Sequence, residues 1–265
     1  MNGRLEFSVE GIGAWTRGAP DWPALRAVLR GERTLRADAP VRPAGNGLPA
    51  AERRRAPDGV LLAVEVAAQA AAMAQRDPAG LPCVFASSFG EPAITDYVCA
   101  TLARAPQELS PTKFHNSVLN AAAGYWTIAT GCTAASSAVT AHLASFGAGL
   151  LEAAALASAD GGPVLFAACD VAAAGPLSDM IGTTLPFGAA LVLAPRAHGA
   201  RVAMTLRPGE AGAPAAPQLA LAAIAGDNPL NAHTLALLAA LAGTQASSLS
   251  LPLAAELSLD MEITP

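Results

Sequence analysis

The sequence predicts an α/β protein with a mixed β-sheet, built as a single domain over residues 1–265. Short apolar runs typical of strands alternate with longer runs typical of helices, which is the pattern of parallel crossover units. Two neighbouring strand-like segments, 186–194 and 200–208, are predicted to pair as a hairpin. The hairpin would add antiparallel strands to the parallel ones, so the sheet should be mixed.

The first part of the chain predicts a strand, a helix and a loop, in that order. Residues 4–15 alternate polar and apolar side chains and predict a strand that leads to Gly11 and Gly13. A short helix should follow, with Asp21 as its N-cap and Gly31 as its stop. Residues 36–59 hold most of the early prolines and predict an exposed loop.

The rest of the chain predicts further helices and strands and then a small C-terminal part. Helices are expected over residues 61–75, 91–105, 119–128, 145–159 and 231–241, and strands over 81–90, 163–169, 186–194 and 200–208. Residues 208–218 are rich in Pro and Gly and predict a flexible linker between a main part, 1–207, and a C-terminal part, 219–265. The C-terminal part combines a helix with an alternating, strand-like tail.

The helix predicted over residues 145–159 differs from an ordinary surface helix. It is apolar almost all round, and Glu152 is its only charged residue before Asp160. Helices on the outside of α/β proteins show a polar stripe, whereas a helix that is apolar all round is buried. We therefore expect this helix to be covered on more than one side.

Composition and charge exclude several classes of protein. Charged residues make up 14% of the chain, against about a quarter in typical globular proteins. Either a partner covers part of the surface, or the composition reflects a proteome rich in Ala, Gly and Arg. The net charge is −5 and the only basic tract is Arg53–Arg55, a solvated loop or a docking patch for an acidic partner. Nucleic-acid binding would need a broader basic face.

Membrane insertion, metal binding and a cofactor are not expected either. The N-terminus lacks the pattern of a signal peptide, and the longest apolar run, 143–157, is too short to span a bilayer. The four cysteines form no CxxC pair and no metal-ligand spacing with the histidines. These features predict a cytoplasmic protein with reduced thiols.

Three motifs resemble a known family. The segments "SPTKFHNSVLNAAAGYWTIATG", "ASFGAGLLEAA" and "PFGAALVLA" are similar to the small β-ketoacyl synthase-like, or chain-length-factor-like, proteins of aryl polyene biosynthesis clusters. Those proteins are related to the N-terminal half of ketosynthases, and the resemblance covers residues 5–195 and the helix within 226–242. It implies a thiolase-like layered αβαβα fold, truncated relative to full ketosynthases, in which a central helix lies between sheets.

The same resemblance raises the question of which residue of this chain stands where ketosynthases carry their nucleophilic cysteine. Ketosynthases carry a cysteine at a strand-to-helix turn, where the helix N-terminus favours the thiolate. Placing Cys132 there requires a helix from about Thr133, but "TAASSAVTA" is more typical of a strand. Alignment on the helix 145–159 places His142 at the position of the nucleophile instead. A histidine there cannot form the acyl-thioester of condensation, and it would then be a remnant or simply a neutral side chain that fills space.

The histidines of the C-terminal half do not match the family either. Ketosynthases carry two histidines there that assist decarboxylation and stabilise the enolate. His233 lies in a predicted helix and lacks the glycine that follows in the family, and His198 lies in a predicted exposed turn. The chain also ends about 150 residues short of a full ketosynthase, by ordinary domain sizes.

The leading hypothesis is a non-catalytic, chain-length-factor-like subunit that pairs with a full-length β-ketoacyl synthase and shapes its acyl tunnel. An acyl carrier protein would be reached through that complex. The candidate interface or tunnel residues are His115, Asn116, Leu119, Tyr125, Trp126 and Phe146. Leu119 stands where relatives tend to carry histidine, and His115 and Asn116 could instead serve a capping and turn role before the helix predicted over residues 119–128. For Tyr125 and Trp126 a contact surface and core packing both remain open.

Two alternatives remain. The chain could be an acyl-transferring enzyme with Cys132 or Ser137 as nucleophile, although no G-x-S-x-G motif is present. It could also be a scaffold that stabilises a partner ketosynthase without touching substrate.

Overall fold

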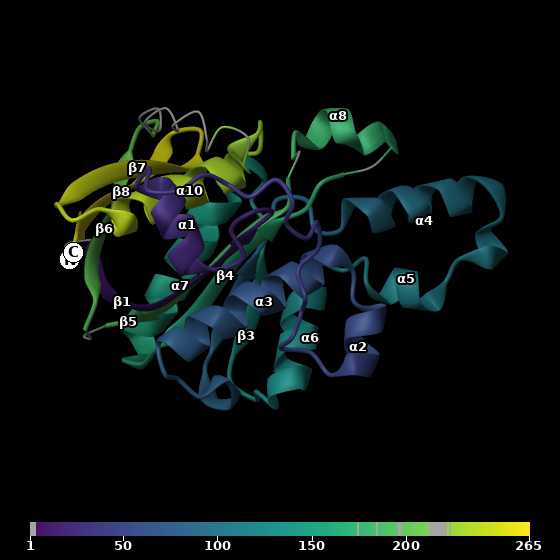
Figure 1. Ribbon diagram of the computed structural model, residues 1–265, viewed down its shortest axis with the longest axis horizontal. Coiled ribbons are helices and arrows are strands. Elements are labelled where there is room, and N and C mark those ends of the chain that lie inside the picture. Colours follow the sequence, from purple (N-terminus) through teal and green to yellow (C-terminus); the bar gives the residue numbers. More distant parts are fainter. Residues whose placement is uncertain (1–3, 174, 184, 196–197, 212–221, 223) are drawn as a thin grey trace.

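The computed structural model describes residues 4–173, 175–183, 185–195, 198–211, 222 and 224–265. Its strands form one eight-stranded sheet in the order β3-β2-β4-β5-β1-β6-β8-β7 (Figure 1). The strands are β1 (Arg4–Thr16), β2 (Cys83–Ala86), β3 (Ser136–Val139), β4 (Val164–Asp170), β5 (Phe187–Ala194), β6 (Ala200–Pro208), β7 (Ser247–Ala254) and β8 (Leu257–Thr264). Strand β2 runs parallel to β3 and β4, and the other pairs are antiparallel. The predicted α/β class with a mixed sheet is confirmed.

Helices cover both faces of this sheet. They are α1 (Trp22–Leu29), α2 (Ala50–Arg55), α3 (Asp58–Met73), α4 (Pro92–Arg104), α5 (Pro111–His115), α6 (Ala121–Thr130), α7 (Ser145–Asp160), α8 (Ser178–Ile181) and α10 (Pro229–Ala242). Helices α3 and α6 share one apolar core with the sheet, and α1, α7 and α10 share another on the opposite face (Figure 1). Helix α1 begins as predicted, because the Asp21 carboxylate accepts a hydrogen bond from Ala24 N at 2.8 Å.

The predicted hairpin of the segments 186–194 and 200–208 is wrong. Strand β1 lies between them: its first half pairs with β6 and its second half with β5. Neighbours in the sequence usually pair, but a long strand from elsewhere in the chain can insert between them. The 13-residue β1 is long enough to serve both neighbours in turn.

The second half of β1 has no neighbouring strand on the side where β6 pairs with its first half. Side chains of helix α3 accept hydrogen bonds from its backbone there instead. The backbone N–H of Ile12 donates to Met73 Sδ at 3.3 Å and that of Ala14 to Gln69 Oε1 at 3.1 Å. Gly13 faces the backbone of α3 so closely that a Cβ atom there would clash with the carbonyl oxygen of Val66. The glycine therefore lets helix and strand approach, and the approach satisfies backbone donors that the sheet leaves unpaired.

Helix α7 lies between the centre of the sheet and strand β7. A Cβ atom on Gly149 would lie 2.7 Å from the ring of Phe166 in β4, and one on Gly147 would lie 2.8 Å from the carbonyl oxygen of Pro252 in β7. The sheet thus curls round to cover the helix from the far side. The expected burial on more than one side holds for the first half of α7, whereas the second half has an exposed face that includes Glu152.

Three smaller expectations need correction. The segment 36–59 is not all loop, because α2 contains Arg53–Arg55 and α3 begins at Asp58. The C-terminal tail is not one strand but the β7–β8 hairpin, which turns at residues 255–256. Most of the predicted linker 208–218 lies outside the described residues.

Candidate functional site

His142 occupies a sharp turn between strand β3 and helix α7. The chain leaves β3, forms the single 3-10 turn η3 (His142–Ala144) and enters α7 directly. His142 has φ +51, and within the described part of the chain only Gln75 shares such a positive φ among non-glycine residues. Ser145 fixes the turn, since its Oγ accepts from Ala141 N at 2.9 Å and donates to the carbonyl oxygen of His142 at 2.7 Å. A strained, exposed strand-to-helix turn is the geometry that displays nucleophiles in α/β enzymes.

Cys132 lies at the opposite end of β3 from this turn. It is buried directly after α6, and its thiol donates to the carbonyl oxygen of Leu81 at 3.5 Å. Its neighbour Cys83 is also buried, and burial together with the nearby Cys132 raises the pKa of the Cys83 thiol to about 12. An activated cysteine needs a cation or a helix N-terminus to favour the thiolate. No charged or imidazole group of the described residues makes a hydrogen bond or ion pair with Cys132.

The turn shares a pocket with the second histidine that the sequence analysis weighed. His142 and His233 both line a cavity of about 460 Å³ between η3, α10 and β7. Most of its walls are Ala, Leu and Pro, and Glu210 is the one acidic residue among them. Burial lowers the pKa of His233, so its imidazole is neutral at pH 7. The structure therefore brings together two histidines that sequence spacing alone did not connect.

A buried carboxylate that holds the loop next to the turn was missed at the level of sequence. Asp170, at the end of β4, accepts hydrogen bonds from Ser87 Oγ at 2.5 Å, from Ser88 N at 3.0 Å and from Asn228 Nδ2 at 2.8 Å. Burial raises its pKa, and these hydrogen bonds act in the opposite direction. The loop that Asp170 holds carries Phe89, whose ring meets the His142 ring edge-on with centroids 6.1 Å apart.

Most of the remaining candidates lie in the core. Tyr125, Trp126 and Phe146 are buried, and Phe146 packs on Phe166 with ring centroids 5.5 Å apart. Of the two possibilities that the sequence left open for Tyr125 and Trp126, the structure favours core packing within this chain.

The α5–α6 region contains the other three candidates. Asn116 is buried, donates to the carbonyl oxygen of Arg55 at 3.2 Å and accepts from the Tyr125 hydroxyl at 3.2 Å. These bonds link the end of α2 to the Tyr125 side chain of α6, and neither of them caps the start of α6, whose N-cap is Asn120. His115 is exposed and Leu119 is half-buried.

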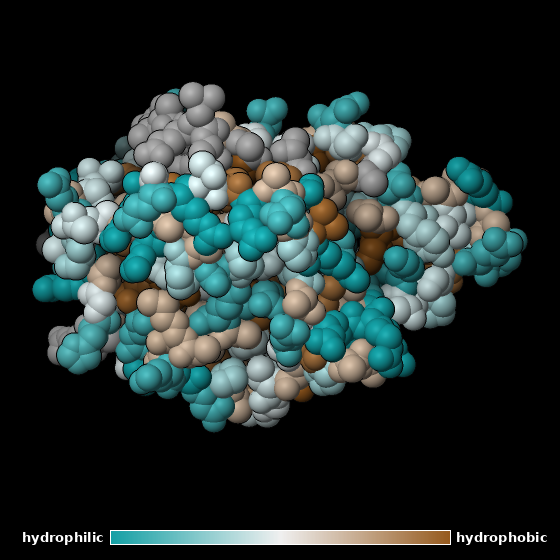
Figure 2. Space-filling model, viewed as in Figure 1, coloured by the Kyte–Doolittle hydropathy of each residue, from teal (hydrophilic) through white to brown (hydrophobic). Residues whose placement is uncertain are grey.

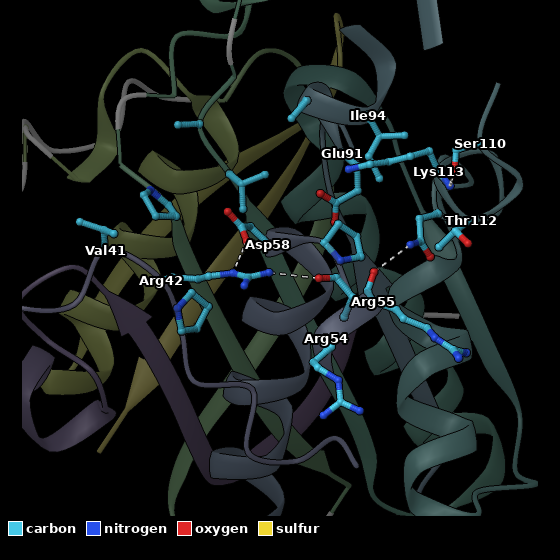
Figure 3. A pocket seen from close by; sticks show the side chains of 18 residues that line it. Val41, Arg42, Arg54, Arg55, Asp58, Glu91, Ile94, Ser110, Thr112 and Lys113 are labelled. Carbon is cyan, nitrogen blue, oxygen red and sulfur yellow. Dashed lines mark hydrogen bonds and ion pairs between the residues drawn. The ribbon is translucent and has the colours of Figure 1, made fainter. Parts of the chain in front are cut away.

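A second pocket, of about 660 Å³, lies between helix α2, the start of helix α3 and helices α4 and α5. Figure 3 shows the Glu91 carboxyl group in its wall, Lys113 extending toward it from α5, and Arg42 paired with Asp58. Glu91 accepts hydrogen bonds from Val60 N at 3.0 Å and Gly59 N at 3.4 Å, at the N-terminus of α3. Burial raises its pKa to about 7, so Glu91 titrates near neutral pH.

Neither pocket contains a metal-binding set. Within the ranges that the structure describes, no three His, Cys, Asp or Glu side chains are grouped so that they could hold a metal ion. In the same ranges no helix is both long enough and apolar enough to cross a membrane.

Comparison with known proteins gives one family. The model of the β-ketoacyl synthase N-terminal domain matches residues 29–254. No curated protein sequence matches the chain.

Solved structures give the same fold. One is the structure of a ketosynthase (ApeO) in complex with its chain length factor (ApeC) from Xenorhabdus doucetiae, at 25% identity and a TM-score of 0.73, covering 97% of this chain and 99% of that one. The ishigamide ketosynthase/chain length factor follows at 15% identity and a TM-score of 0.71, covering 98% and 99%. A type II polyketide ketosynthase in complex with its acyl carrier protein has 12% identity and a TM-score of 0.72, with the same coverage. The fold is therefore thiolase-like, and the chain belongs to the β-ketoacyl synthase family.

Proposed function

We propose that this chain is a chain-length-factor-like subunit that forms no acyl-thioester itself and pairs with a full-length, active β-ketoacyl synthase. The observation that carries the proposal is His142 at the strained turn before α7. We take this turn as the position of the family's nucleophile, where condensation needs a thiolate, and an imidazole cannot form the thioester. Cys132, the nearest alternative, is buried at the other end of β3.

Strand β3 supports the pairing. It forms one edge of the sheet, and its residues Ser136–Val139 include no charge and no proline. Edge strands that must stay unpaired are commonly protected by charges, prolines or bulges. The other edge, β7, has such features, with Pro252 and a register shift beside it. An unprotected edge next to the turn therefore suits sheet pairing with a second ketosynthase-fold chain.

The exposed apolar side chains near β3 agree with such pairing. Helix α6 packs beside β3, and its Ile128 is 78% exposed, while Leu143, just after the turn, is 50% exposed. Figure 2 shows how hydrophobic and hydrophilic residues are distributed over one face of the molecule. Large apolar side chains left in solvent mark interaction surfaces when they gather in one region. The related ketosynthase of Xenorhabdus doucetiae is in complex with its chain length factor. We extend that arrangement to this chain, with an acyl carrier protein reached through the complex and polyene-type acyl chains as products.

The cytoplasm is the proposed location. The four cysteines are free, as expected in a reducing compartment.

Pairing is tested by co-expression with a full-length β-ketoacyl synthase from the same gene neighbourhood. We expect the two chains to co-purify, and Ser136→Lys on β3 to abolish co-purification. Ser248→Lys is the matched control, because Ser248 is an exposed serine on the opposite edge strand. Equal co-purification of both variants would exclude β3 as the pairing edge.

Catalysis is tested on the purified chain alone. We expect no transfer of a radiolabelled acyl group from an acyl-carrier-protein thioester to the chain. If label were transferred and Cys132→Ala abolished it, the chain would be an acyl-transferring enzyme and the proposal would be wrong.

A further inference from the structure

The turn that precedes helix α2 contains an Asn–Gly pair. Asn46 and Gly47 are its central residues, and Leu48 N closes the turn by donating to the carbonyl oxygen of Gly45 at 3.0 Å. Asparagine is one of the thermally labile residues of proteins. Its side-chain amide is lost when the backbone nitrogen of the next residue attacks it, and a glycine, which has no Cβ atom, leaves that nitrogen unhindered. The chain therefore presents a reactive pair of residues in an ordered turn.

The attacking nitrogen is free in the folded chain. Gly47 N makes no hydrogen bond within the residues that the structure describes. Asn46 is exposed, so water reaches its side chain. A Cβ atom on Gly47 would lie 2.8 Å from Val64 Cγ1 in α3. Close packing against α3 thus favours glycine at this position, and with it the unhindered nitrogen.

Two side chains hold Asn46 in place, and one of them polarises its amide. Arg53 Nη1 donates to Asn46 Oδ1 at 3.1 Å, and Glu65 Oε2 accepts from Asn46 N at 3.3 Å. Attack on Cγ of Asn46 places negative charge on Oδ1. A cationic donor already aimed at that oxygen stabilises the charge as it develops, as the donors of an oxyanion hole do. The contact with Arg53 therefore lowers the barrier to the reaction.

We propose that Asn46 is a modification site, which deamidates spontaneously in the folded chain with Gly47 N as nucleophile and Arg53 as the stabilising cation. The nitrogen forms a bond to Asn46 Cγ and gives its proton to solvent. The Cγ–Nδ2 bond breaks, and the amide nitrogen takes a proton from solvent and leaves as ammonia. Water then opens the cyclic imide at either of its carbonyls, which yields aspartate or isoaspartate. The inference does not depend on the proposed function.

The product changes the surface beside helix α2. A carboxylate at position 46 would pair with Arg53, whose guanidinium already contacts that side chain, and would lie near Glu65. Isoaspartate also adds a carbon atom to the backbone of the turn, next to the buried Leu48. Deamidation would thus reduce the positive charge of the tract Arg53–Arg55 and alter the turn that leads into it.

The test follows the full chain by peptide mapping during incubation at pH 8. The tryptic peptide 37–53 contains Asn46, and mass spectrometry distinguishes its amide form from its acid forms. Whole-chain mass does not serve, because Asn2–Gly3 is a second Asn–Gly pair. A synthetic peptide of the sequence 37–53 gives the rate without the fold. We expect Asn46 of the folded chain to convert to aspartate and isoaspartate on the time scale of the peptide.

Arg53→Met separates the contribution of the cation from that of the dipeptide. It should slow conversion in the folded chain about fivefold, the rate equivalent of one hydrogen bond of about 1 kcal/mol. Arg54→Met is the matched control, because Arg54 is exposed and makes no hydrogen bond with Asn46 among the described residues; its rate should be that of the wild-type chain. The inference is overturned if Asn46 stays intact while the peptide converts, or if the Arg53→Met chain converts as fast as the Arg54→Met chain.

Discussion

Replacement of Glu91 by Gln should stabilise the protein at alkaline pH and destabilise it by about 1 kcal/mol in acid. The Glu91 carboxyl group lies largely buried at the N-terminus of α3, and this burial, the largest of the effects on the group, raises its pKa from 4.5 to about 7. The folded state therefore holds the proton more tightly than the unfolded chain does. Stability from this group is fully present below pH 4.5 and is lost as the pH rises through 7.

The size of the effect follows from the same pKa. Each pKa unit corresponds to about 1.36 kcal/mol, so the ionised carboxylate should cost about 3 kcal/mol above pH 7. A neutral amide avoids that cost. The amide oxygen of the Glu91→Gln variant could still accept from Val60 N, but its amide nitrogen would face Gly59 N, where the carboxylate now accepts at 3.4 Å. That loss of about 1 kcal/mol is the same at every pH and does not alter the slope.

The assay is urea unfolding of the wild-type chain and the Glu91→Gln variant at pH 5, 6, 7 and 8. The difference in unfolding free energy should grow by about 2.5 kcal/mol in favour of the variant between pH 5 and pH 8. Glu108→Gln makes the same charge change on an exposed residue and should show no such trend. A difference that stays flat across this range, or that grows in favour of the wild-type chain, would refute the reasoning.

Three further substitutions test the packing of the fold, each by urea unfolding. Gly13→Ala should destabilise the chain by about 3 kcal/mol or prevent folding, because the new methyl group meets the backbone of α3; an effect below about 1 kcal/mol would contradict that contact. Phe146→Ala should cost about 3–5 kcal/mol, since its ring packs on Phe166 inside the core. A neutral effect would mean that Phe146 is exposed in the isolated chain. Asp21→Ala should cost about 1 kcal/mol, and a cost equal to that of Asp21→Asn would show that charge, not capping, matters.

Local signals in the sequence predicted the helices well and the strand order poorly. Asp21 caps α1 as expected because an N-cap depends only on residues three positions apart. The hairpin of 186–194 with 200–208 failed because β1, nearly two hundred residues earlier, inserts between these strands. Nothing in either segment records that insertion. Pairing over such distances is decided by the packing of the whole sheet.

In the candidate site, too, the local features could be predicted from the sequence and the long-range contacts could not. The choice of His142 over Cys132 rested on "TAASSAVTA" forming a strand, and β3 does span Ser136–Val139. The assignment of the nucleophile position to His142 stays a prediction. Asp170 could not have been found in this way, since its partners Ser87 and Asn228 lie 83 and 58 residues away in the chain. Only a folded chain brings such groups to one carboxylate.

The geometry of β3 links the proposed pairing edge to the turn of His142. The strand ends at the turn of His142, and its open edge is the proposed pairing surface, so both depend on the same short segment. What fixes that segment is the packing of α7 against Phe166 and β7, together with the hydrogen bonds of Ser145. None of these contacts involves the side chain of residue 142. If His142 stands at the position of the nucleophile, as proposed, an imidazole there would prevent condensation and leave these contacts in place. The turn can therefore keep its strained form whichever side chain residue 142 displays.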